Sequence, residues 1–183
     1  MTGRRLRLVI LLAGLLLASL VLLAWSQPWF ELTLGGGQKL EVAGQQADPA
    51  LSALGLAALA LIGALSIATR PLRVTLGAVQ AAIGLFVVTT ALSAASAPLV
   101  ASASVITDAT GVSGAHSVAA LVASLTETPW PFVAVGAGAL LALTGVAVAL
   151  TAPRWPAATR KYDAARPKDP WDSLSHGDDP TKA

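Results

Sequence analysis

Four long stretches of the chain contain no charged residue. No Asp, Glu, Lys or Arg occurs in residues 8–26, 51–69, 74–107 and 128–153. A helix needs roughly 20 apolar residues to cross the hydrocarbon core of a bilayer, and each stretch supplies that length. The pattern predicts an all-α membrane protein, a four-transmembrane-helix bundle over residues 1–153 with spans at about 7–26, 51–69, 74–96 and 131–152.

Basic residues predict the orientation of these spans. Eleven of the twelve lie before the first span, between the second and third, or after the fourth: Arg4, Arg5, Arg7, Arg70, Arg73, Arg154, Arg160, Lys161, Arg166, Lys168 and Lys182. The loops 27–50 and 97–130 hold only Lys39. By the positive-inside rule, both termini are cytoplasmic, both loops are external, and the protein is a multi-pass protein of the cell membrane. The alternative is a cleaved signal peptide, but the first apolar run is longer than a usual signal core, so we expect a retained helix.

Small residues recur at every fourth position inside the predicted spans. This spacing lets helix backbones approach closely where lipid provides no hydrophobic drive for association. We interpret it as packing between helices of one chain rather than as a dimer seam, because Ala is abundant throughout. The residues concerned are Ala60, Ala64 and Ala68, Gly77 and Ala81, and Gly138 and Ala142.

Composition narrows the classes of function. With 55% hydrophobic and 12% charged residues, the chain has too little polar surface for a soluble globule, and its net charge of +2 does not favour binding to nucleic acid. The four uncharged stretches hold no acidic or basic side chain, which argues against a secondary active transporter, and we expect Gln80 and Thr144 to satisfy local hydrogen bonds. The histidines, His116 and His176, fall on opposite sides of the membrane. We therefore expect no metal site, no cofactor, no catalytic residues and no enzyme activity.

The two external loops carry local structure. Residues 29–34 and 39–42 alternate apolar and polar positions around Gly35-Gly36-Gly37, which predicts a small extracellular β-hairpin. A lone hairpin is marginally stable, so we expect it to rest on the helix ends or on the other loop. In that loop, residues 113–126 place apolar side chains at helical spacing, which predicts a short amphipathic surface helix. Its apolar residues are Val118, Leu121, Val122 and Leu125.

Aromatic residues mark the point where the first helix leaves the bilayer. Trp25, Trp29 and Phe30 flank Pro28 there. The simpler interpretation is an anchor in the interfacial aromatic belt, and the alternative is recognition of a partner or an aromatic small molecule. The candidate partner-binding residues on this side are Trp25, Pro28, Trp29, Phe30 and Gly44.

Residues 154–183 are charged and rich in proline, which predicts a cytoplasmic and mostly disordered tail. Within it, Asp169-Pro170 and Gly177 could begin and end a single helical turn that places Trp171 and Leu174 on one face. The simpler interpretation is a solvated tail. The alternative is a docking motif for a cytoplasmic or membrane protein, with Trp171, Leu174 and Gly177 as its candidate residues.

Two motifs carry a resemblance to a known family. One is Trp25-Ser26-Gln27-Pro28-Trp29-Phe30 after an Arg-led helix, and the other is residues 171–181 in the tail, with further agreement at Val42-Ala43-Gly44 and at 70–77. With these motifs, almost the whole chain resembles the actinobacterial tryptophan-associated transmembrane protein family. The resemblance implies a four-pass actinobacterial membrane protein that is linked to tryptophan biosynthesis by gene position and has no established activity.

From these features we expect a noncatalytic membrane accessory or scaffold protein that contacts the lipid bilayer and a protein partner. The alternative is an oligomeric transporter or exporter of tryptophan or a related aromatic compound. Capture of a partner would favour the first, and labelled flux across vesicles would favour the second. The oligomeric state stays open at this point.

Overall fold

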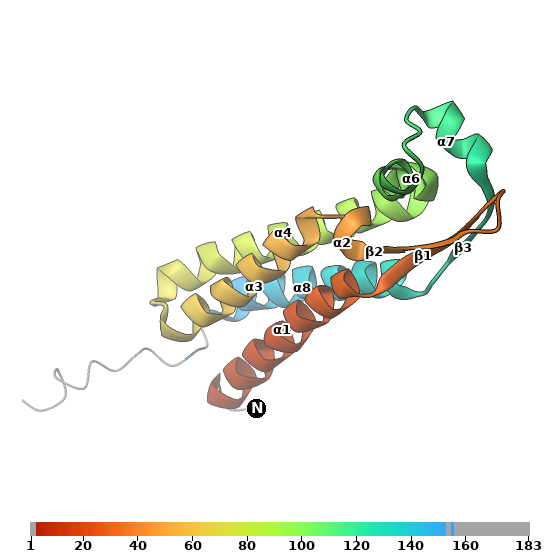
Figure 1. Cartoon of the computed structure of the whole chain (residues 1–183). Coiled ribbons are helices and arrows are strands. Elements are labelled where there is room, and N and C mark those ends of the chain that lie inside the picture. The colour runs from red at the N-terminus through yellow and green to blue at the C-terminus, as the bar shows by residue number, and fades with distance from the viewer. Residues whose placement is uncertain (1–2, 153–154, 156–183) are drawn as a thin grey trace, which may run out of the picture.

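Four long helices run side by side and form the body of the protein (Figure 1). The structure, a computed structural model, describes residues 3–152 and 155. The long helices are α1 (Gly3–Ser26), α3 (Ala50–Ile67), α4 (Arg70–Ser96) and α8 (Trp130–Thr151). Each is long and apolar enough to cross a membrane. Pro71 and Pro131 lie in first turns, where the missing N–H costs no helical hydrogen bond.

Helices α4 and α8 make the closest contact in the bundle, with backbone against backbone. A methyl group added at Gly84 would lie 2.6 Å from the carbonyl oxygen of Gly138, and one added at Gly145 would lie 2.7 Å from that of Gly77. The predicted packing within one chain is therefore confirmed for this seam. It is wrong for Ala60 and Ala64, which are exposed on α3, whereas Ala68 is buried.

One polar pair lies at the centre of the bundle. Gln80 of α4 is 1% exposed, and its Nε2 donates a hydrogen bond of 2.7 Å to Oγ1 of Thr144 in α8. The Thr144 hydroxyl donates in turn to the carbonyl of Leu141 at 2.7 Å. These bonds are of the kind expected for polar groups that have no access to water.

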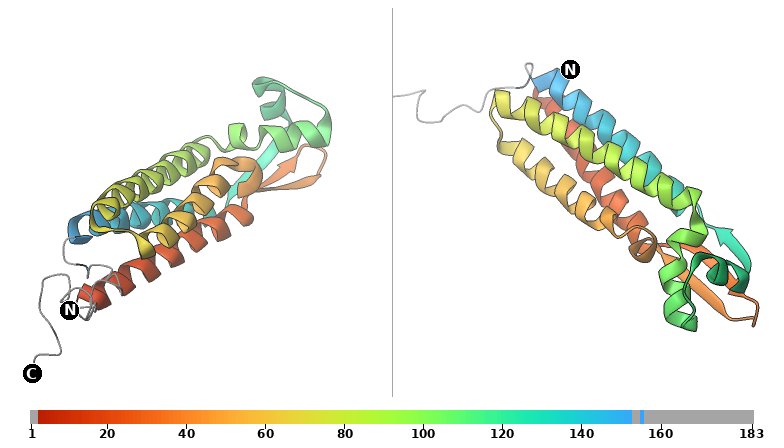
Figure 2. Two further views of the ribbon diagram at one scale, coloured as in Figure 1. Left: turned by 90° about the vertical axis from the view of Figure 1, so that its left-hand side faces the viewer. Right: turned by 90° about the horizontal axis from the view of Figure 1, so that it is seen from above.

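The remaining segments gather at one end of the bundle. We call residues 28–47 and 98–127 the cap. It contains strands β1 (Pro28–Leu34), β2 (Lys39–Ala43) and β3 (Val122–Glu127), and the short helices α2 (Gly44–Ala47), α5 (Pro98–Ala101), α6 (Ala103–Thr110) and α7 (Ala115–Leu121). The strands form an antiparallel sheet in the order β2-β1-β3, and Figure 2 shows α6 and α7 beside it.

The sheet confirms the hairpin and corrects the surface helix. Strands β1 and β2 pair as expected, with Gly37 at a φ of +82° in the turn, a value that favours glycine. The helix ends at Leu121, however, and residues 122–127 form a third strand on the other side of β1. A short apolar run fits either period, and here β1 supplies hydrogen-bonding partners that favour the strand.

The apolar side of the cap is continuous with the bundle. Trp29 and Phe30 of β1 have no exposed surface, and they belong to one core that also contains Val21 of α1 and Ile106 of α6. Because the core runs across the junction, the cap and the helix ends exclude water together. The hairpin therefore rests both on the helix ends and on the other loop, the two supports predicted for it.

The opposite end of the bundle is basic. The link between α3 and α4 consists only of residues 68–69. Arg70 and Arg73 therefore belong to the first turn of α4, and the prediction that they lie in the connection is wrong. Arg73 is 1% exposed, and its Nε donates to the carbonyl of Ala68 at 2.9 Å. The guanidinium carbons of Arg73 and Arg7 lie 5.4 and 5.9 Å from the ring centre of Trp155. Such cation–π contacts favour keeping this aromatic ring buried against the helix ends.

Candidate functional site

A cleft of about 820 Å³ opens between α3 and α4 where the bundle meets the cap. We call it the α3/α4 cleft. Its walls are residues 46–50 at the junction of α2 and α3, one face of α4 between Phe86 and Ala97, and Val100, Ala101 and Ser104 beyond the end of α4. Pockets of about 300–1,000 Å³ are typical of sites for small organic ligands.

The helical repeat places hydroxyl groups on the α4 wall. Phe86, the adjacent pair Thr89 and Thr90, Ser93 and Ala97 follow one another about one helical turn apart, so they share one face of α4. The hydroxyls of Thr89 and Thr90 donate to carbonyls of their own helix at 3.0 and 3.4 Å. Because each proton is used in this way, the hydroxyl oxygens keep lone pairs that can accept a hydrogen bond.

Asp48 lies in the opposite wall and is the charged residue of the cleft lining. It is 6% exposed, and its Oδ2 is shielded without a hydrogen-bond partner in the part of the chain that the structure describes. The backbone around it is held in place, since the Asp48 N–H donates to the Gly44 carbonyl at 2.8 Å and the Asp48 carbonyl accepts from Leu51 N–H at 3.3 Å. A carboxylate removed from water in this way is costly unless another group compensates its charge.

The five candidate residues of the first loop do come together, but as a structural joint. The Trp29 Nε1 donates to the Ala24 carbonyl at 2.8 Å, and its ring meets Phe30 edge to face at 6.4 Å between ring centres. A methyl group on Gly44 would lie 2.7 Å from the Trp25 carbonyl oxygen, so glycine allows α2 to approach α1. Trp29 and Phe30 have no exposed surface, so neither ring can lie in a lipid-facing aromatic belt or contact a partner. Both interpretations of the sequence, the belt anchor and the recognition site, are therefore corrected for these two rings. Trp25 and Pro28 keep partial exposure.

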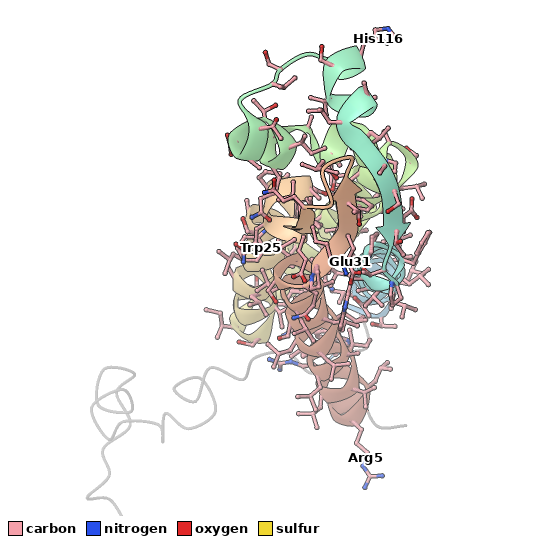
Figure 3. All side chains as sticks on the ribbon, turned by 45° about the vertical axis from the view of Figure 1, so that its right-hand side comes forward. Arg5, Trp25, Glu31 and His116 are labelled. Atoms are coloured by element: carbon pink, nitrogen blue, oxygen red, sulfur yellow. The ribbon has the colours of Figure 1, made fainter. Side chains whose placement is uncertain are left out.

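The other candidates are separate from this joint. His116 is exposed on α7, at the end of the molecule opposite Arg5 (Figure 3). Trp171, Leu174, Gly177 and His176 lie outside the described residues. Within the described ranges, no three His, Asp or Glu side chains gather in a group that could hold a metal ion.

Sequence reasoning missed the α3/α4 cleft. Asp48 precedes Pro49 at the start of an apolar run, a position typical of a helix cap. In the structure Pro49 occupies the N-cap position and no side chain caps the helix, so the carboxylate is left for the cleft wall. The one available signal was the recurrence of hydroxyl residues at helical spacing over 86–97 in an otherwise apolar span.

Comparison with known proteins places the chain in a family. No curated protein and no solved structure matches it. A family model, described as tryptophan-associated transmembrane protein, matches residues 10–181. That match covers α3, α4, α8 and the whole cap, and α1 from residue 10 onward. The chain therefore belongs to the tryptophan-associated transmembrane protein family.

Proposed function

We propose that this protein is a noncatalytic accessory or scaffold protein of the cell membrane, associated with tryptophan biosynthesis. The observation that carries the proposal is the core shared by the cap and the helix ends, which includes Trp29, Phe30 and Val21. A cap packed into the bundle presents a surface of fixed shape on one side of the membrane. Such a surface is suited to holding a partner, and the family description supplies the link to tryptophan.

The packing of α4 against α8 supports an accessory role over transport by a single chain. Backbone contact at Gly84 and Gly145 leaves no space between these helices, and the polar pair Gln80 and Thr144 is isolated among apolar neighbours. We expect no protein-dependent flux of labelled tryptophan into or out of reconstituted vesicles, with empty vesicles as the control. Flux that appears only with the protein would overturn the accessory role in favour of a transporter.

We propose that the cap is external and that both termini are cytoplasmic. The distribution of charge supports this orientation. Arg5, Arg7, Arg70 and Arg73 lie at the end opposite the cap, whereas the cap holds Lys39 with the acidic residues Glu31, Glu41, Asp108 and Glu127, and Asp48 lies beside it at the start of α3. Basic residues are retained on the cytoplasmic side during insertion.

Single-cysteine variants test the orientation cleanly, because the chain has no cysteine of its own. Lys39→Cys and Asp108→Cys should react with a membrane-impermeant thiol reagent on intact cells, and Arg160→Cys should react only after the cells are opened. The reverse pattern would invert the orientation.

We also propose that the tail carries a docking motif for a protein partner. A tagged full-length protein should capture a specific partner, and the double variant Trp171→Ala with Leu174→Ala should lose it. Tyr162→Ala is the matched control, because it removes an aromatic tail residue outside the motif. Equal capture by the double variant would overturn the role of the tail.

A further inference from the structure

We propose that the α3/α4 cleft binds an amphipathic organic cation, in which a protonated amine is joined to an apolar body, with the amine at Asp48. This inference goes beyond the accessory role and does not depend on a partner at the tail. It rests on three observations: a buried carboxylate with one unpaired oxygen, a mixed wall of hydroxyl and apolar groups, and a lining that holds no positive charge among the described residues.

The carboxylate of Asp48 supplies the recognition of charge. It is 6% exposed, and Oδ2 is shielded from water and has no hydrogen-bond partner within the described residues. The described Arg side chains cannot compensate it, because they lie at the opposite end of the bundle. An ammonium group in the cleft would replace the missing hydration with a charge-assisted hydrogen bond, which is stronger than a neutral one.

The rest of the lining fits an apolar body. Phe86, which is 61% exposed, Ala94 and Val100 give this lining its apolar side chains, and Thr90 and Ser93 add hydroxyl groups to it. A cleft of about 820 Å³ is far larger than a metal ion needs, and a single carboxylate is too few ligands for one. The size and the lining therefore favour an organic molecule.

The same lining discriminates by charge. Among the residues that the structure describes, no Lys, Arg or His belongs to the cleft wall, so the carboxylate of a zwitterion or an acid would lie near Asp48 without a counter-charge from this wall. Like charges that are brought together away from water repel strongly. We therefore expect the cleft to favour a cationic amine over the corresponding amino acid, and both over the corresponding carboxylic acid.

A series of indole compounds tests this, because they share one apolar body and differ in charge. Full-length protein in phosphatidylcholine nanodiscs is titrated with radiolabelled tryptamine, a cation, in competition with tryptophan, a zwitterion, or with indole-3-propionate, an anion. We expect saturable binding of tryptamine above that of empty nanodiscs, and competition that is at least about 10-fold weaker by tryptophan and weakest by the acid. Equal competition by tryptophan or indole-3-propionate would overturn the charge selectivity.

Variants assign the site. Asp48→Asn keeps nearly the same shape and should weaken tryptamine binding by at least about 10-fold, as the loss of one partner of a buried charge pair does. Asp108→Asn makes the same chemical change at an exposed cap residue and should bind like the wild type. Ser93→Leu fills the α4 wall while keeping Asp48, and should also reduce binding. Unchanged affinity in Asp48→Asn, in a protein whose thermal unfolding matches the wild type, would refute the proposal.

Discussion

The α4–α8 seam yields the sharpest test of how the bundle is held together. In Gly145→Ala, the new methyl group would lie 2.7 Å from the Gly77 carbonyl oxygen and 2.9 Å from the Ala81 Cα. Both neighbours are backbone atoms, which cannot turn aside as a flexible side chain can, so the two helices must separate. Overpacking of this kind costs about 1–3 kcal/mol, and a gap of about 0.5–1 Å also weakens the dispersion contacts along the seam.

Gly136→Ala is the matched control for this change. Gly136 lies on the same helix, and a methyl group there would meet nothing within 4 Å. It therefore reports the gain in helix propensity alone, which favours Ala over Gly by up to about 1 kcal/mol in water. The free energy of unfolding is measured by titration with sodium dodecyl sulfate in mixed micelles and followed by far-UV circular dichroism. We expect Gly145→Ala to be less stable than Gly136→Ala by about 2 kcal/mol, and equal stability of the two variants would refute the close packing of α4 and α8.

Three further changes test the cap and the polar centre of the bundle. Trp29→Ala removes a fully buried ring and should cost about 3–5 kcal/mol, seen as a lower melting temperature by near-UV circular dichroism, whereas the exposed Glu31→Ala should melt like the wild type. Thr128→Val removes the hydroxyl that donates to the Pro28 carbonyl at 2.7 Å and should cost about 1 kcal/mol. Hydrogen exchange of the amide at position 128, whose N–H donates to the Trp29 carbonyl, should become faster in this variant. An unchanged exchange rate would contradict the role of the Thr128 hydroxyl in joining β1 to α8. In Gln80→Leu, the Thr144 hydroxyl still donates to the Leu141 carbonyl. We therefore expect the free energy of unfolding in the same detergent titration to change by less than about 1 kcal/mol. A loss above about 2 kcal/mol would mean that Gln80 makes a stronger contact than the bond to Thr144.

The local pattern of apolar and polar residues was sufficient to predict the long helices and the hairpin. A span depends on the length of an uninterrupted apolar run, and a hairpin depends on alternation around a permissive turn, so both are properties of neighbouring residues. Residues 122–127 show where this reasoning ends. Their partner, β1, lies some ninety positions earlier in the chain, and only that pairing makes the segment a strand.

The sites show the same division. The sequence singled out Trp29, Phe30 and Gly44 for their chemistry, and the fold assigned them to a joint between α1, β1 and α2. Nothing in the sequence distinguished Asp48 from the other acidic residues of the loops, because an Asp before a Pro is common at the start of a helix. Its environment depends on α4 and α5, which follow Asp48 in the chain only after the whole of α3.

The sequence by itself determined that this chain has four helices able to cross a membrane, and that the segments at their two ends differ in charge. Only the tertiary structure decided which glycines meet, which aromatic rings are covered and which carboxylate loses its water. The physical reason is that partition into lipid follows from the apolar length of one segment. Burial and close contact follow from the approach of several segments that no local pattern relates.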